Sequence, residues 1–84
     1  MQVSLQALKA FESAARRGSF KLAAEELSLT PTAISHHIGN LESRLNVSLF
    51  HRQGRRISLT GTGIRLAKAT SEGFRKIDSA LEEV

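Results

Sequence analysis

The chain has 84 residues, 40% of them hydrophobic, and its lack of cysteine excludes disulfide bonds and thiolate metal sites. No apolar run approaches the ~20 residues that span a bilayer, so we expect a small globular domain in the cytoplasm without a membrane partner. The net charge of +4 favours a polyanionic partner, and six basic but no acidic residues lie between Glu42 and Glu72.

The ends of the first two predicted helices are marked by capping residues. The first helix is expected from Val3 to Arg17, with Ser4 as its N-cap and Gly18 just after its last turn. Its buried face is expected to comprise Leu5, Leu8, Phe11 and Ala15, flanked by Ala7 and Ala14. Ser19 is expected to cap a short second helix over residues 20–27.

A third helix, expected from Pro31 to Leu45, has two faces of different character. Thr30 is its expected N-cap, and Asn46 suits the left-handed position after its end. One face is apolar and comprises Ile34, Ile38, Leu41 and Leu45. The other face is slim and nearly uncharged, with Thr32, His36, Gly39 and Ser43, flanked by Ser35 and Asn40. This second face predicts a helix that enters the DNA major groove.

The next segment is expected to form a β-hairpin. Two short apolar strands, residues 49–52 and 56–59, flank a glycine-containing turn at residues 53–55. A basic hairpin directly after a helix-turn-helix is typical of a winged helix. The predicted fold is therefore mainly α, with a winged helix-turn-helix of three helices and a hairpin wing over residues 1–59.

Residues 60–84 are expected to form a long linker helix capped by Thr60. An apolar stripe along this helix spans ~35 Å and outreaches the small domain before it, which predicts a homodimer contact. We expect Ile64 and Ala67 to lie near the domain and the residues from Phe74 onward to lie in the dimer. The proposed stripe comprises Ile64, Ala67, Ser71, Phe74, Ile77 and Leu81.

Candidate DNA contacts lie on the third helix and on the wing. On the helix they are Thr30, Pro31, Thr32, Ser35, His36, His37 and Asn40. On the wing they are Arg52, Arg55 and Arg56, which are expected to contact phosphate or the minor groove. Both sets could instead be solvated polar surface. No metal site is expected at the three histidines, because no cysteine or acidic cluster joins them.

Four motifs occur in a characteristic order. They are SFKLAAEEL over residues 19–27, TPTAISHHIGNLE over 30–42, LNVSLFHR over 45–52 and SLTGTG over 58–63. In type and spacing they resemble the N-terminal DNA-binding domain of the LysR-type transcriptional regulators of bacteria. The resemblance covers essentially the whole chain. It implies a winged helix-turn-helix with a dimerising linker helix, a missing C-terminal domain that binds a small effector, and a tetrameric full-length protein.

The resemblance also implies roles for individual residues. Ser35 matches a serine that usually contacts phosphate or base, and His36 stands where the family often reads base edges. His37 stands at a common glutamine position, and Arg52 matches the arginine after the Leu-Phe pair. Gly54, Arg55 and Arg56 match the tip of the wing. No cofactor is implied for this domain.

Three function classes follow from these observations. The leading one is sequence-specific recognition of an inverted repeat in double-stranded DNA by two such domains. A second is a protein-interaction module, which predicts no salt-dependent DNA binding. The third is an enzyme, for which the chain offers no nucleophile–base–acid set, no phosphate loop and no metal spacing.

Overall fold

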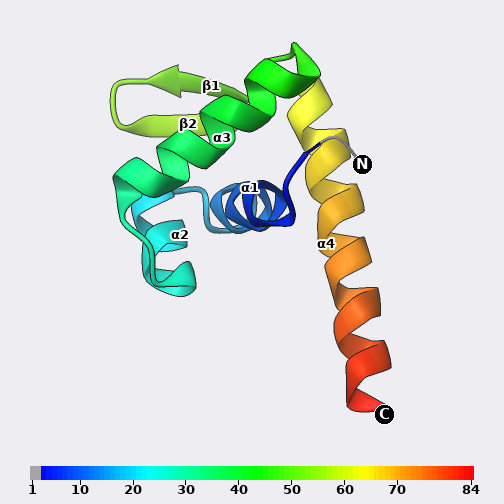
Figure 1. Ribbon diagram of the computed structural model, residues 1–84. Coiled ribbons are helices and arrows are strands. Elements are labelled where there is room, and N and C mark those ends of the chain that lie inside the picture. The colour runs from blue at the N-terminus through cyan, green and yellow to red at the C-terminus, as the bar shows by residue number, and fades with distance from the viewer. Residues whose placement is uncertain (1–2) are drawn as a thin grey trace.

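The computed structural model describes residues 3–84, and in this range the chain forms four helices and one two-stranded antiparallel sheet (Figure 1). The elements are α1 (Leu5–Arg17), α2 (Phe20–Leu27), α3 (Pro31–Leu45), β1 (Phe50–Gln53), β2 (Arg56–Leu59) and α4 (Gly61–Glu82). The predicted class, a mainly α winged helix-turn-helix with a long final helix, is confirmed. Within the described part of the chain, no helix is both long and apolar enough to cross a bilayer.

Each helix begins at the residue that follows the N-cap indicated by the sequence. The side chains of Ser4, Ser19, Thr30 and Thr60 each accept a hydrogen bond from the backbone N–H three residues later, at 3.0–3.1 Å. This bond satisfies one of the free N–H groups of the first turn. α1 therefore starts at Leu5, two residues later than predicted, because Ser4 has extended backbone as its cap.

Left-handed residues end the first three helices and turn the chain sharply. They are Gly18, Ser28 and Asn46, with φ of 67°, 56° and 55°. Glycine and asparagine adopt this conformation readily, whereas serine does so at some cost. The backbone N–H of Ser28 donates to the carbonyls of Ala24 and Glu25. The resulting compact turn sets α3 across α2.

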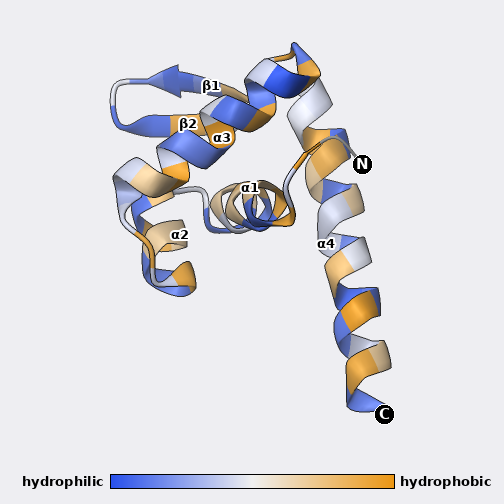
Figure 2. Ribbon diagram, viewed as in Figure 1, coloured by the Kyte–Doolittle hydropathy of each residue, from blue (hydrophilic) through white to orange (hydrophobic). Residues whose placement is uncertain are grey.

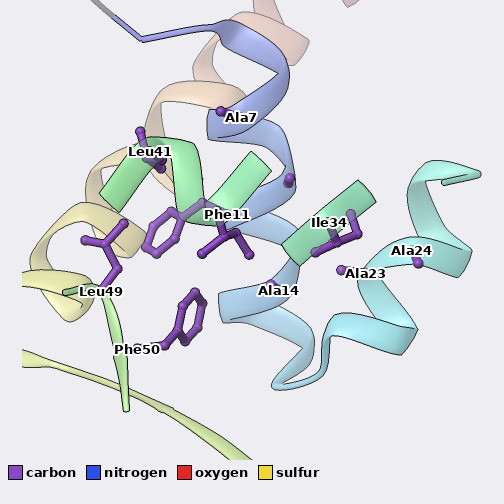
Figure 3. Close-up of a cluster of buried hydrophobic side chains, with 11 residues drawn as sticks. Ala7, Phe11, Ala14, Ala23, Ala24, Ile34, Leu41, Leu49 and Phe50 are labelled. Carbon is purple, nitrogen blue, oxygen red and sulfur yellow. The ribbon is translucent and has the colours of Figure 1, made fainter. Parts of the chain in front are cut away.

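The core lies where α1, α2, α3 and the start of the wing meet (Figure 3). Phe11 is fully buried, and its ring centroid lies 5.5 Å from that of Phe50. Much of the surrounding face is alanine, contributed by Ala7, Ala10, Ala14, Ala23 and Ala24. Small side chains let the helices approach closely, so the large residues Phe11, Ile34, Ile38, Leu41 and Leu49 fill the centre.

Two residues that were predicted to be buried in the core are exposed, so these two predictions are wrong. Leu5 is 56% exposed because it opens α1 and faces the lower part of α4 instead of the core. Leu45 is 42% exposed because it ends α3 beyond the last packed turn. The other three residues of the apolar face of α3 are buried, as predicted.

The wing is a tight hairpin in which Phe50 pairs with Leu59 and Gln53 with Arg56. The loop is therefore only Gly54-Arg55, and Gly54 adopts a positive φ of 61°. β1 begins one residue later than predicted. The backbone of Leu49 is occupied elsewhere, because its N–H donates to Glu42 and its carbonyl accepts from Thr60 N–H at 3.0 Å.

α4 packs on the domain through its first turns and then projects from it (Figure 1). Gly63 is buried, while Leu66 and Ala67 are half-buried against the core. The prediction that Ile64 also lies near the domain is wrong, since Ile64 is 57% exposed. The neighbouring Gly63 occupies the inward position, so that Ile64 points to solvent.

Candidate nucleic-acid interface

The outer face of α3 is polar, exposed and nearly free of charge. Thr32, His36, Gly39, Asn40 and Ser43 are exposed, and Thr30 and Pro31 are exposed at the start of the helix. Ser35 and His37 are half-buried at the two sides of this face. The buried Ile34, Ile38 and Leu41 fix the rotation of α3 against the core, so the polar face must point outward. Its side chains can both donate and accept hydrogen bonds, so this surface can pair with donor or acceptor groups of a partner.

The wing extends beside α3 and is hydrophilic along most of its length (Figure 2). Arg55 and Arg56 are exposed at and next to its tip. Their guanidinium groups provide fixed positive charge and several N–H donors, which suit phosphate oxygens.

A surface groove joins the wing to the helix-turn-helix. Its lining includes Ser35 of α3, Arg52 and Arg55 of the wing, and Lys21 of α2. Three of the predicted contact residues are therefore brought together here. Lys21 was not predicted to belong to the site; it stands in the first turn of α2, and no sequence signal links that turn to the wing.

Arg52 is held by two neighbours as well as being partly open to solvent. Its Nη2 donates to Glu42 Oε1 at 3.3 Å, and its guanidinium lies 5.1 Å from the ring centroid of Phe20. The side chain is 42% exposed, so some of its five N–H donors still face outward. The residue thus supports the wing and also presents charge at its surface.

An ion-pair network at the C-terminal end of α1 joins α1 to the last turn of α2. Glu26 accepts hydrogen bonds from Arg16, from Ser13 Oγ at 2.9 Å and from Arg17 Nη1 at 3.0 Å, and Arg16 Nε also donates to Glu12 at 2.9 Å. The hydrogen bond from Arg16, assisted by those from Ser13 and Arg17, lowers the pKa of Glu26 to about 2 against the opposing effect of desolvation. The same pairing with Glu26, and then with Glu12, raises the pKa of Arg16.

The three histidines do not converge. His36 and His37 lie at different angles on α3, and His51 lies on β1. Among residues 3–84, no group of three or more histidine, cysteine, aspartate or glutamate residues could hold a metal ion.

Comparison with known proteins places this geometry in a family. The model of the bacterial regulatory helix-turn-helix proteins of the LysR family matches residues 5–64. The HTH-type transcriptional regulator y4mQ of Sinorhizobium fredii is 47% identical over 81 residues, which are 96% of this chain and 27% of that protein. The chain spans about a quarter of the length of the curated relatives that it matches.

Solved structures agree with the sequence relatives. The probable transcriptional regulator PA0477 from Pseudomonas aeruginosa superposes with a TM-score of 0.90 at 34% identity, over 98% of this chain and 27% of that one. The DNA-binding domain of CbnR, solved in complex with DNA, superposes with a TM-score of 0.84 at 25% identity, over 96% of this chain and 93% of that one. The chain therefore belongs to the LysR family of bacterial regulatory helix-turn-helix proteins, as the DNA-binding domain of a transcriptional regulator rather than an enzyme.

Proposed function

We propose that α3 reads base edges in the major groove of double-stranded DNA while the wing holds the adjacent backbone or minor groove. The observation that carries this proposal is the juxtaposition of a slim, uncharged, exposed helix face with the exposed arginines of the wing. A neutral face can approach bases closely, and the arginines supply attraction to phosphate that depends on salt.

The proposed contacts divide by chemistry. Thr32, Ser35, His36 and Asn40 carry hydrogen-bonding groups along the outer face of α3 and are assigned to base edges or nearby phosphates. Thr30 and Pro31 are assigned to positioning at the DNA backbone, since the start of a helix favours phosphate. His37, half-buried at the side of the polar face, is also assigned to the DNA backbone. Arg52, Arg55 and Arg56 are assigned to phosphate or the minor groove.

We further propose that two copies associate through α4 and bind an inverted repeat, and that the full-length protein is a tetramer. Half-sites read by such a dimer are about one helical turn apart or a multiple of it. Effector binding is assigned to a part of the full protein outside these 84 residues, because the chain corresponds to about a quarter of its relatives.

The proposal is tested by selecting bound duplexes from a random-sequence pool and then comparing two variants on a selected and a random duplex. His36→Ala should lose about 1–3 kcal/mol of discrimination, mainly by weakening binding to the selected duplex. Arg55→Ala should weaken binding to both duplexes and lower the slope of affinity against salt by about 1. Equal losses on both duplexes for His36→Ala would contradict its role in reading bases.

A further inference from the structure

We propose that Glu42 is a positioning residue, which holds the wing at the angle to α3 that lets both elements reach one DNA duplex. This inference rests on the proposed function. Glu42 itself is not assigned a DNA contact.

One carboxylate joins the reading helix to the start of the wing. Glu42 Oε2 accepts from the backbone N–H of Leu49 at 2.8 Å and of Phe50 at 3.4 Å, and Oε1 accepts from Arg52 Nη2 at 3.3 Å. Glu42 stands in the last turn of α3, and all three donors belong to the segment that enters and forms β1. Its side chain is 20% exposed, so water competes weakly for these bonds.

The first helix of the helix-turn-helix, α2, holds the same strand from another side. Phe20 of α2 packs edge-on against Phe50, with ring centroids 5.5 Å apart, and carries the guanidinium of Arg52 over its face. Arg52 is therefore fixed between Glu42 of α3 and Phe20 of α2. The strand has no larger sheet to support it, because β1 pairs only with β2 among the described residues. Its orientation depends on these side-chain contacts together with the hydrogen bond from Thr60 N–H to the Leu49 carbonyl.

Because Glu42 is negatively charged, the direction in which its removal changes DNA affinity tests the inference. A carboxylate near a DNA-binding surface repels phosphate, so removing it should tighten binding if charge alone matters. If Glu42 positions the wing, removing it should instead weaken binding. The two effects have opposite directions.

The first experiment uses Glu42→Gln, which keeps the shape of the side chain and removes its charge. Glu25→Gln is the matched control, since Glu25 is exposed on α2 and makes no ion pair within residues 3–84. Affinity is measured for a duplex selected by the unaltered protein and for a random duplex. We expect Glu42→Gln to bind the selected duplex about tenfold more weakly, with less protection beside the major-groove site in a hydroxyl-radical footprint, and Glu25→Gln to bind as tightly or more tightly.

Two further variants separate positioning from folding and from charge. Glu42→Asp keeps the charge but is one methylene shorter, and it should also weaken binding. In an Arg55→Ala background, Glu42→Gln should have less than its full effect, because one of the three wing contacts that it positions is already gone. Binding is compared at a temperature where circular dichroism shows each variant fully folded.

Unchanged or tighter binding by Glu42→Gln would overturn the inference, as would a full additional loss in the Arg55→Ala background. Failure of the unaltered protein to bind any duplex would instead contradict the proposed function. The two failures are therefore distinguishable.

Discussion

Gly63 shows how one residue without a side chain fixes the junction between the wing and α4. A Cβ placed on Gly63 would lie 2.1 Å from the carbonyl oxygen of Leu49 and 3.0 Å from Leu59 Cδ2. The backbone of α4 therefore touches the wing directly. The hydroxyl of Thr60 adds a bond to the carbonyl of Ser48 at 2.7 Å, which closes the same junction from the other side.

We predict that Gly63→Ala destabilises the protein although alanine favours helix. The new methyl group must push the Leu49 backbone away, which costs about 1–3 kcal/mol of unfolding free energy, and this outweighs a propensity gain of at most about 1 kcal/mol. Gly73→Ala in the same helix is the control, because nothing lies within 4 Å of its added Cβ. Urea unfolding at a single protein concentration should give a lower midpoint for the first variant and a higher one for the second.

Individual residues differ in how far the sequence reveals their roles. The caps at Ser4, Ser19, Thr30 and Thr60 were predictable, because a cap acts on backbone three residues away. The roles of Gly63 and Glu42 were not predictable, because Leu49, whose backbone both residues meet, lies 7 residues from Glu42 and 14 from Gly63, at a place that only the fold determines. A sequence pattern therefore shows contacts within one helical turn, but it does not show where two elements pack closely or where a side chain bonds to another element.

Between elements, α1 and α2 are joined by charge as well as by alanine packing. Glu26 in the last turn of α2 accepts hydrogen bonds from Arg16, Arg17 and Ser13 of α1, which tie the two helices together. Because the side chain of Glu26 is 27% exposed, solvent screens this network and limits its contribution to about 1 kcal/mol.

We predict that this contribution fades in acid. The pKa of Glu26 is lowered from its ordinary value of 4.5 to about 2 in the folded protein. The folded state therefore holds fewer protons than the unfolded state, and the stabilisation is complete above pH 4.5 and lost as the pH falls towards 2. The unfolding free energies of the unaltered protein and Glu26→Gln should differ at neutral pH and converge only as the pH falls to about 2.

The helices themselves were predicted well, and their burial less so. Three of the four residues that the apolar spacing of α3 singles out are buried, because a single central face packs on α1. For α1, the same spacing singled out Leu5 and understated the alanines, since periodicity weights large residues above small ones. In this domain the close helix packing depends on alanine, and the pattern of large residues alone does not show which face meets a neighbour.

At the scale of the whole molecule, the lower half of α4 leaves an apolar surface uncovered. Figure 2 shows hydrophobic bands on this projecting part of the helix. Ile77 is 54% and Leu81 is 67% exposed, and with Phe74, Leu5 and Leu27 they line a groove between α4 and the domain. Leu5, which was predicted to lie in the core, is exposed and extends the apolar stripe of α4. Burying these side chains in a dimer would recover about 1.5–3 kcal/mol for each.

We predict that Leu81→Lys breaks the proposed dimer and, through it, the binding of paired half-sites. A lysine in an apolar contact must either lose its hydration or hold the helices apart, so sedimentation velocity should show self-association weakened at least about tenfold. Ser79→Lys adds the same charge on another side of α4 and should leave the dimer intact. A dimer binds its second half-site as an intramolecular event, so Leu81→Lys should lose far more affinity for an inverted repeat than for a single half-site. Equal losses on both duplexes, or a dimer that survives Leu81→Lys, would show that association does not depend on this surface.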